Sequence, residues 1–88
     1  MSGELEELRK KIDEADRELL EALSKRMRLV KNIGELKHKE HLEIEDTERW
    51  RNLLHERLSW AQSLGISAEL VKDIFESIHK TAIALEKN

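Results

Sequence analysis

A row of apolar residues along the N-terminal part of the chain constrains the fold more than any other feature. The row has the helical spacing of three and four residues and consists of Leu5, Leu8, Ile12, Ala15, Leu19 and Ala22. This apolar seam predicts one helix from about Gly3 or Glu4 to about Lys39. At 1.5 Å per residue, a helix of that length extends over more than about 50 Å.

The chain is too small to bury this seam by itself. A compact domain of 88 residues should be only about 30 Å across. We therefore expect a second copy of the long helix to pair with the first in antiparallel orientation, which gives an intertwined helical-bundle homodimer. Seams of this kind also suit trimers and tetramers, so the oligomer number is less constrained than oligomerisation itself.

Two shorter helices are expected after the long one. Residues 38–45 lose the helical period and are the first loop candidate. Asp46 or Thr47 can cap a second helix, which Gly65 would end. Ser67 can cap a third. The sequence thus predicts an all-α fold with three helices per chain.

Composition supports this fold and argues against several functions. The chain has no proline and three glycines, 40% of its residues are charged, and residues 1–88 are expected to form a single domain. The absence of cysteine excludes disulfides and thiolate metal sites, and the four histidines show no ligand spacing, so we expect no metal. A net charge of −3 argues against nucleic-acid binding. Without an apolar run of about 18 residues or a signal peptide, we expect no membrane association and a cytoplasmic location.

Positive side chains lie in or beside the seam, where apolar ones are expected. Arg26 and Lys37 are in it, Arg9 lies next to it, and Arg49 follows Asp46 by three residues. A single Arg or Lys commonly lies along apolar surface with its charge in water. Several cations converging inside a bundle would each cost roughly several kcal/mol without an anion. The pattern therefore favours a small ligand with two carboxylates, which guanidinium groups bind bidentately.

Four segments taken together are similar to one known family. They are LRKKIDEADRELLEALSKR (8–26), IGELK (33–37), IEDTER (44–49) and LGISAELVKDIFESI (64–78). In their order and spacing they resemble the all-helical chorismate mutases. The resemblance implies a homodimer with two active sites and a Claisen rearrangement of chorismate to prephenate, in aromatic amino acid biosynthesis, without any cofactor. Fixed positive groups would hold the flexible dianion in its reactive shape and stabilise charge that develops on its ether oxygen.

The resemblance also implies roles for individual residues. Arg9 would be donated across the dimer to the partner's site. Arg26 and Arg49 would bind the substrate's carboxylates within one chain. Lys37 would donate to the ether oxygen and to a carboxylate, and Asp46 would lie near the 4-hydroxyl group.

A second donor to the ether oxygen is expected from the third helix. Glu86 follows Phe75 by eleven residues and shares a helical face with His79 and Ala82. Many mutases have Gln at the position of Glu86 and some have Glu. Ala82 stands where some have Ser, and the resemblance implies that it too contacts the substrate. A glutamate can donate only when it is protonated, which burial or the substrate's carboxylates would favour. Without the resemblance, Glu86 would be interpreted as a solvated charge.

Two alternatives remain open. Trp50 stands where many mutases have a Glu that contacts the 4-hydroxyl, and residues 25–31 and 56–66 resemble the isochorismate-pyruvate lyase branch, which forms salicylate. The mutase is favoured because the loop between Lys37 and Arg49 has the mutase length and Asp46 is retained. A non-catalytic helical dimerisation module would instead pair the seam cations with acids and bind no small molecule.

Overall fold

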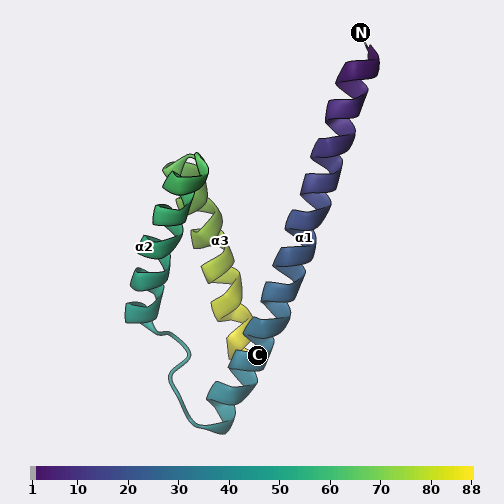
Figure 1. The fold of residues 1–88 in the computed structure, drawn as a ribbon. Coiled ribbons are helices and arrows are strands. Elements are labelled where there is room, and N and C mark those ends of the chain that lie inside the picture. Colours follow the sequence, from purple (N-terminus) through teal and green to yellow (C-terminus); the bar gives the residue numbers. More distant parts are fainter. Residues whose placement is uncertain (1) are drawn as a thin grey trace.

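The computed structural model describes residues 2–88, and all of its regular structure in that range is helical. The helices are α1 (Ser2–Lys39), α2 (Thr47–Leu64) and α3 (Ala68–Lys87) (Figure 1). This confirms the predicted all-α fold with three helices. The radius of gyration is 16.7 Å, compared with about 12 Å for a compact domain of this size. The chain by itself is therefore an extended molecule.

The helix boundaries follow the predicted capping signals. Asp46, not Thr47, is the N-cap of α2, and its side chain accepts a hydrogen bond of 3.0 Å from the backbone N–H of Arg49. Gly65 ends α2 in the left-handed conformation, with φ at 70°. Ser67 caps α3 and accepts a hydrogen bond of 3.2 Å from the N–H of Leu70.

The long helix ends at Lys39, as the sequence predicts, so His38 and Lys39, which were also part of the first loop candidate, are helical. His41 has a φ of 58°, and the N–H of Leu42 donates to the carbonyl of Lys37 at 2.8 Å. These are the features of a Schellman turn, built here without glycine. Because the left-handed residue of this turn is His41, the usual glycine signal for a helix end is missing from the sequence.

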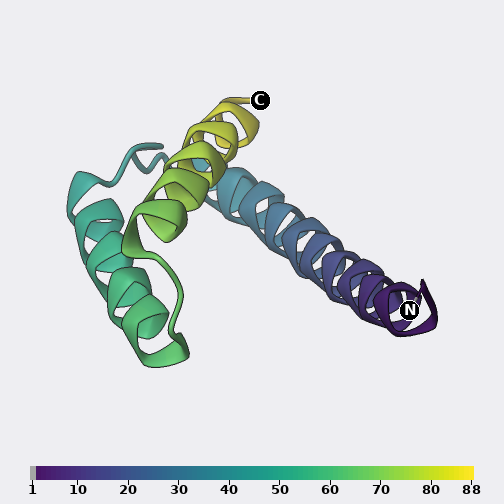
Figure 2. The ribbon, with the colours of Figure 1, turned by 90° about the horizontal axis from the view of Figure 1, so that it is seen from above.

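The helix α3 packs against both α1 and α2, and it lies between them in Figures 1 and 2. The buried apolar residues come from all three helices, and they are Val30, Leu53, Ala61, Val71 and Ala82. None of the large side chains described is fully buried. The core is consequently thin and lies where the C-terminal half of α1 meets the other two helices.

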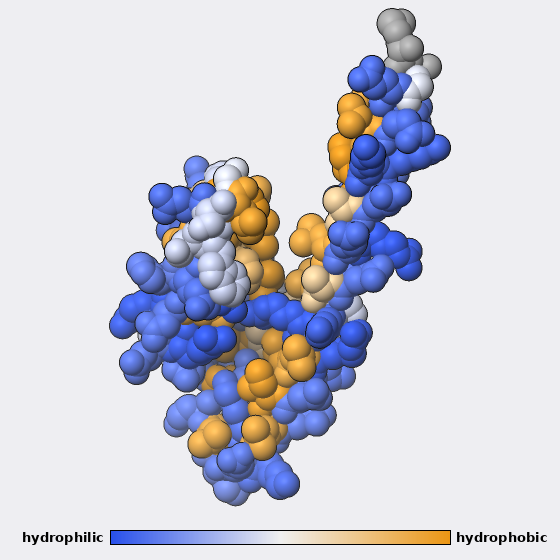
Figure 3. Space-filling model, viewed as in Figure 1, coloured by the Kyte–Doolittle hydropathy of each residue, from blue (hydrophilic) through white to orange (hydrophobic). Residues whose placement is uncertain are grey.

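The N-terminal half of α1 projects from this core as an arm, which we define as residues 3–22 (Figure 1). Every residue of the arm is exposed, including its large apolar side chains, Leu5, Leu8, Ile12, Leu19 and Leu20. Figure 3 shows apolar patches on the side of the arm that faces the α2–α3 pair. The apolar seam predicted from the sequence is thus present, and within one chain it is uncovered. None of the helices described combines the length and the apolar character that a bilayer span requires.

Candidate active site

A pocket of about 280 Å³ lies where the three helices meet. Six of the seven residues expected to bind substrate line it, namely Arg26, Lys37, Asp46, Arg49, Ala82 and Glu86. The rest of its wall is mostly apolar and is formed by Val30, Ile33, Ile44, Leu53 and Ile83, with Trp50 and His79 beside them. The pocket therefore combines an apolar lining with a small number of converging charged groups, which is typical of small-molecule sites.

Each of the three helices contributes charged groups at a defined place. Arg26 and Lys37 come from α1, where eleven residues make about three turns and so place both on one face. Arg49 lies in the first turn of α2, directly after its cap Asp46. Glu86 lies in the last turn of α3. The pocket is thus assembled from segments that are distant in sequence.

Lys37 is the link between α1, the loop and α3. Its Nζ lies 2.6 Å from Oε1 of Glu86 and donates a hydrogen bond of 2.6 Å to the carbonyl oxygen of Ile44. Glu86 is 7% exposed, and within the described chain no hydrogen bond of good geometry reaches its buried Oε1. The charge contact with Lys37 is therefore what compensates this buried carboxylate.

Arg26 is a cation without a carboxylate partner. Neither Arg26 nor Arg49 has an acidic side chain within 4 Å in residues 2–88. Burial lowers the pKa of Arg26 from its ordinary value, and repulsion by Arg57 and Arg49 lowers it further. The pocket thus presents positive charge that the chain itself does not neutralise.

Arg57 is a feature that the sequence interpretation missed. Its guanidinium lies 4.4 Å from the ring centroid of Trp60 and 6.0 Å from that of Phe75, which are cation–π distances. Arg26 lies over the same Phe75 ring at 5.9 Å. Both arginines therefore lie within about 6 Å of one aromatic ring. Nothing in the spacing of Arg57 distinguishes it from a surface arginine.

Trp50 and His79 form a stacked pair in the pocket wall. Their ring centroids are 4.1 Å apart and their planes differ by 11°. Both side chains are half-buried and both line the pocket. The pair places a flat aromatic surface where the resemblance implies a carboxylate in many mutases.

Arg9 lies outside this pocket. It is exposed on the arm and pairs at 3.3 Å with Glu6 of the same helix. Along the axis of α1 it lies about 25 Å from Arg26. Arg9 therefore cannot reach the pocket of its own chain.

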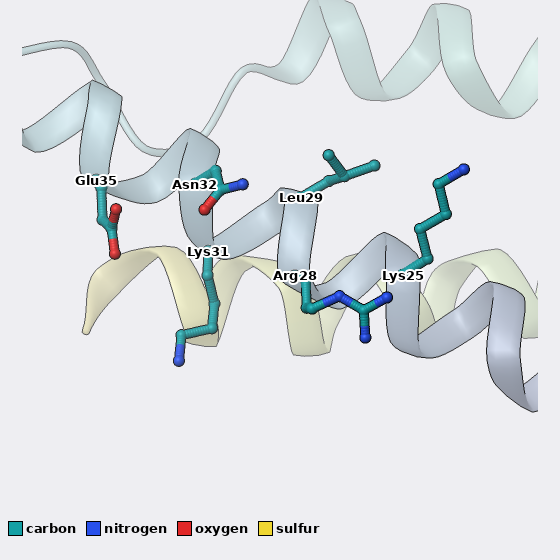
Figure 4. A pocket seen from close by; sticks show the side chains of 6 residues that line it. All are labelled: Lys25, Arg28, Leu29, Lys31, Asn32 and Glu35. Atoms are coloured by element: carbon teal, nitrogen blue, oxygen red, sulfur yellow. The ribbon is translucent and has the colours of Figure 1, made fainter.

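Residues 2–88 offer little support for two other kinds of site. No group of three His, Cys, Asp or Glu side chains there is placed to hold a metal ion. A wider hollow of about 550 Å³ is lined by Lys25, Arg28, Leu29, Lys31, Asn32 and Glu35. Figure 4 shows that all six belong to one helix and that their side chains point in different directions. This hollow lacks the converging groups of a binding site.

Comparison with known proteins agrees with this geometry. Residues 8–87 match the family described as chorismate mutase type II. The chain is 38% identical over 82 residues to the T-protein of Haemophilus influenzae, covering 93% of this chain and 22% of that protein. It is 29% identical over 87 residues to the chorismate mutase of Methanocaldococcus jannaschii, covering 99% and 88%. It is also 35% identical over 74 residues to the isochorismate pyruvate lyase of Pseudomonas aeruginosa, covering 84% and 72%.

The lengths of these relatives differ widely. The chain spans less than a quarter of the Haemophilus influenzae T-protein, but most of the Methanocaldococcus jannaschii chorismate mutase. The shared region in the longer relative is thus one part of a larger protein.

Proposed function

The chain belongs to the chorismate mutase type II family, and from this premise we propose that its pocket converts chorismate to prephenate. The reaction is an intramolecular rearrangement. The ether C–O bond breaks, a C–C bond forms, and no atom enters or leaves. The site therefore needs neither a nucleophile nor a cofactor, and its task is to hold the substrate and to stabilise developing charge.

The observation that carries this proposal is the uncompensated positive charge in the pocket. Arg26 and Arg49 line it without acidic partners in the described chain, and mutual repulsion contributes to the lowered pKa of Arg26. A ligand with two carboxylates relieves this repulsion, because each guanidinium can bind one carboxylate through two hydrogen bonds. A purely structural dimerisation module would instead pair these cations with acids.

Lys37 and Glu86 are the groups that we assign to the ether oxygen. They lie side by side at 2.6 Å, on two helices that both line the pocket. Both can donate to one oxygen once Glu86 is protonated. A dianionic substrate would favour that protonation, since its carboxylates compete with Glu86 for Lys37. Two donors fixed in advance stabilise charge in the transition state more than in the ground state.

A second copy of the chain is proposed to complete the site. The arm exposes its apolar seam, which a partner of the same length can cover along its whole extent. Arg9 lies on that arm, out of reach of its own pocket. In an antiparallel dimer the arm would pass the partner's core, so Arg9 would enter the partner's pocket as a further carboxylate ligand.

The lyase remains the second candidate because one relative carries that name and because Trp50 and His79 form part of the pocket wall. Supplying chorismate and isochorismate in separate assays tests both functions. The proposal predicts that prephenate forms from chorismate faster than salicylate and pyruvate form from isochorismate. The reverse order of rates would assign the lyase reaction, and absence of turnover with either substrate would contradict both.

A further inference from the structure

We infer that Gly34 and His38 of α1 form a seat for the last turn of α3 and act as positioning residues that hold Glu86 against Lys37. The role of Glu86 in catalysis rests on the proposed function. The seat itself rests on contacts in the structure, which can be tested whether or not the chain is a mutase.

Gly34 lies where the two helices approach each other closely. A Cβ built at Gly34 would lie 2.9 Å from Cα of Glu86 and 3.3 Å from its carbonyl oxygen. Contacts below 3.0 Å hardly occur for real Cβ atoms, and the atoms met are backbone, so no change of rotamer can relieve them. A glycine inside a helix costs about 1 kcal/mol relative to alanine. Its presence in α1 is explained by this close approach, because its φ is not left-handed.

His38 makes the second contact of the seat. Its Nε2 lies 2.8 Å from the carbonyl oxygen of Glu86. A carbonyl only accepts, so Nε2 must carry the proton. The last carbonyls of a helix have no partner within that helix, and His38 supplies one to α3. The bond therefore ties a helix end, which would otherwise fray readily.

Three residues of α1 thus hold one residue of α3. Gly34, Lys37 and His38 are spaced i, i+3 and i+4, which places them on one helical face. Gly34 leaves room for the Cα of Glu86, Lys37 contacts its carboxylate, and His38 contacts its carbonyl oxygen. Fixing the backbone of Glu86 limits the positions that its carboxylate can reach, and Lys37 then holds it in one of them. Removing either contact should let the last turn of α3 move away from Lys37.

Gly34→Ala tests the seat, because alanine should favour the helix itself but disturb the contact with α3. Alanine favours the helix, so without the seat this change would stabilise the chain and leave turnover intact. The inference predicts instead a kcat lower by about tenfold or more and faster amide exchange in the last turn of α3. Gly3→Ala is the matched control, because it lies in the same helix with nothing within 4 Å of the added Cβ. Equal behaviour of the two variants would overturn the inference.

His38 variants test the second contact and do not depend on the folding of Gly34→Ala. His38→Leu removes the donor and should lower kcat about threefold to tenfold, the size of one hydrogen bond. His38→Gln keeps a donor at the same reach and should restore most of the loss. In a Glu86→Ala background the loss from His38→Leu should disappear, because His38 affects the rate only through the position of the Glu86 carboxylate, which alanine lacks. An undiminished loss in that background would contradict a positioning role.

Amide exchange separates failure of this inference from failure of the proposed function. If the unmodified chain does not turn over chorismate, the proposed function fails. Faster exchange in the last turn of α3 in His38→Leu, restored by His38→Gln, would still establish the seat. If amide exchange in the last turn of α3 is unchanged in both His38→Leu and Gly34→Ala, the inference of a seat is wrong.

Discussion

Nζ of Lys37 lies 2.6 Å from Oε1 of Glu86, and this ion pair joins the C-terminal part of α1 to the last turn of α3. The same ammonium holds the loop through the carbonyl of Ile44. One side chain therefore connects all three segments that surround the proposed position of the ether oxygen. Its loss should affect both the reaction and the fold.

Lys37→Ala is predicted to lower kcat by about a hundredfold to a thousandfold, the cost of removing one fixed donor from a developing anion. It also leaves the buried Glu86 without its counter-charge, so the melting temperature should fall. The double variant Lys37→Ala/Glu86→Gln should recover part of that stability, because the unpaired carboxylate is gone. A fully active Lys37→Ala variant would exclude Lys37 as a donor.

The rate of the unmodified enzyme is predicted to rise as the pH falls below neutral. Glu86 can donate to the ether oxygen only in its protonated form, and the fraction in that form grows as the pH decreases. Glu86→Gln carries a donor at every pH, so its profile of kcat against pH should be flat over this range. The measurement is kcat at saturating chorismate across the pH range. Matching slopes for the two proteins would count against the role of Glu86.

Trp50 is predicted to limit discrimination between chorismate and isochorismate. Its ring is stacked on His79, with the centroids 4.1 Å apart. A carboxylate at this position could accept a hydrogen bond from the 4-hydroxyl group of chorismate. Trp50→Glu should raise the ratio of kcat/KM for chorismate to that for isochorismate by about tenfold, the value of a hydrogen bond to a charged group. Asn52→Glu, an exposed position of α2, adds the same charge outside the pocket. An equal change of the ratio in both variants would show a general charge effect.

The exposed seam of the arm is predicted to be the contact between two chains. Leu8 and Ile12 are 53% and 59% exposed in one chain, and a carboxylate there would be buried in the dimer. Leu8→Glu/Ile12→Glu should weaken self-association by about a hundredfold or more, measured by sedimentation equilibrium. Lys10→Glu changes the charge of the same arm at a position outside the seam. An unmodified chain that sediments as a monomer at all concentrations would contradict the predicted interface.

Local signals in the sequence were sufficient for the helices. The spacing of the seam predicted α1. Asp46 and Gly65 marked the two ends of α2, and Ser67 marked the start of α3, since caps act within a few residues. The end of α1 at Lys39 agrees with the prediction, but the turn that follows it was not predicted, because its left-handed residue is His41 and not a glycine. A side chain rarely adopts that conformation, so the sequence gives no direct sign of it.

Two of the cations that line the pocket could be predicted from the sequence, because a charged residue in an apolar seam is unexpected. These cations are Arg26 and Lys37, which interrupt the regular spacing of apolar residues along α1. Arg57 and His38 interrupt nothing, and their contacts depend on how α2 and α3 pack. Tertiary contacts of this kind join residues that are distant in sequence, and no local spacing encodes them.

Mixing two inactive variants measures most directly whether cations from two chains build one site. Arg9→Ala and Arg26→Ala should each be nearly inactive alone, because each removes one carboxylate ligand from both sites of the dimer. Refolding them together in equal amounts should restore about a quarter of the unmodified activity, since half of the dimers are mixed and each has one intact site. A mixture no more active than the average of its two components would contradict the shared site.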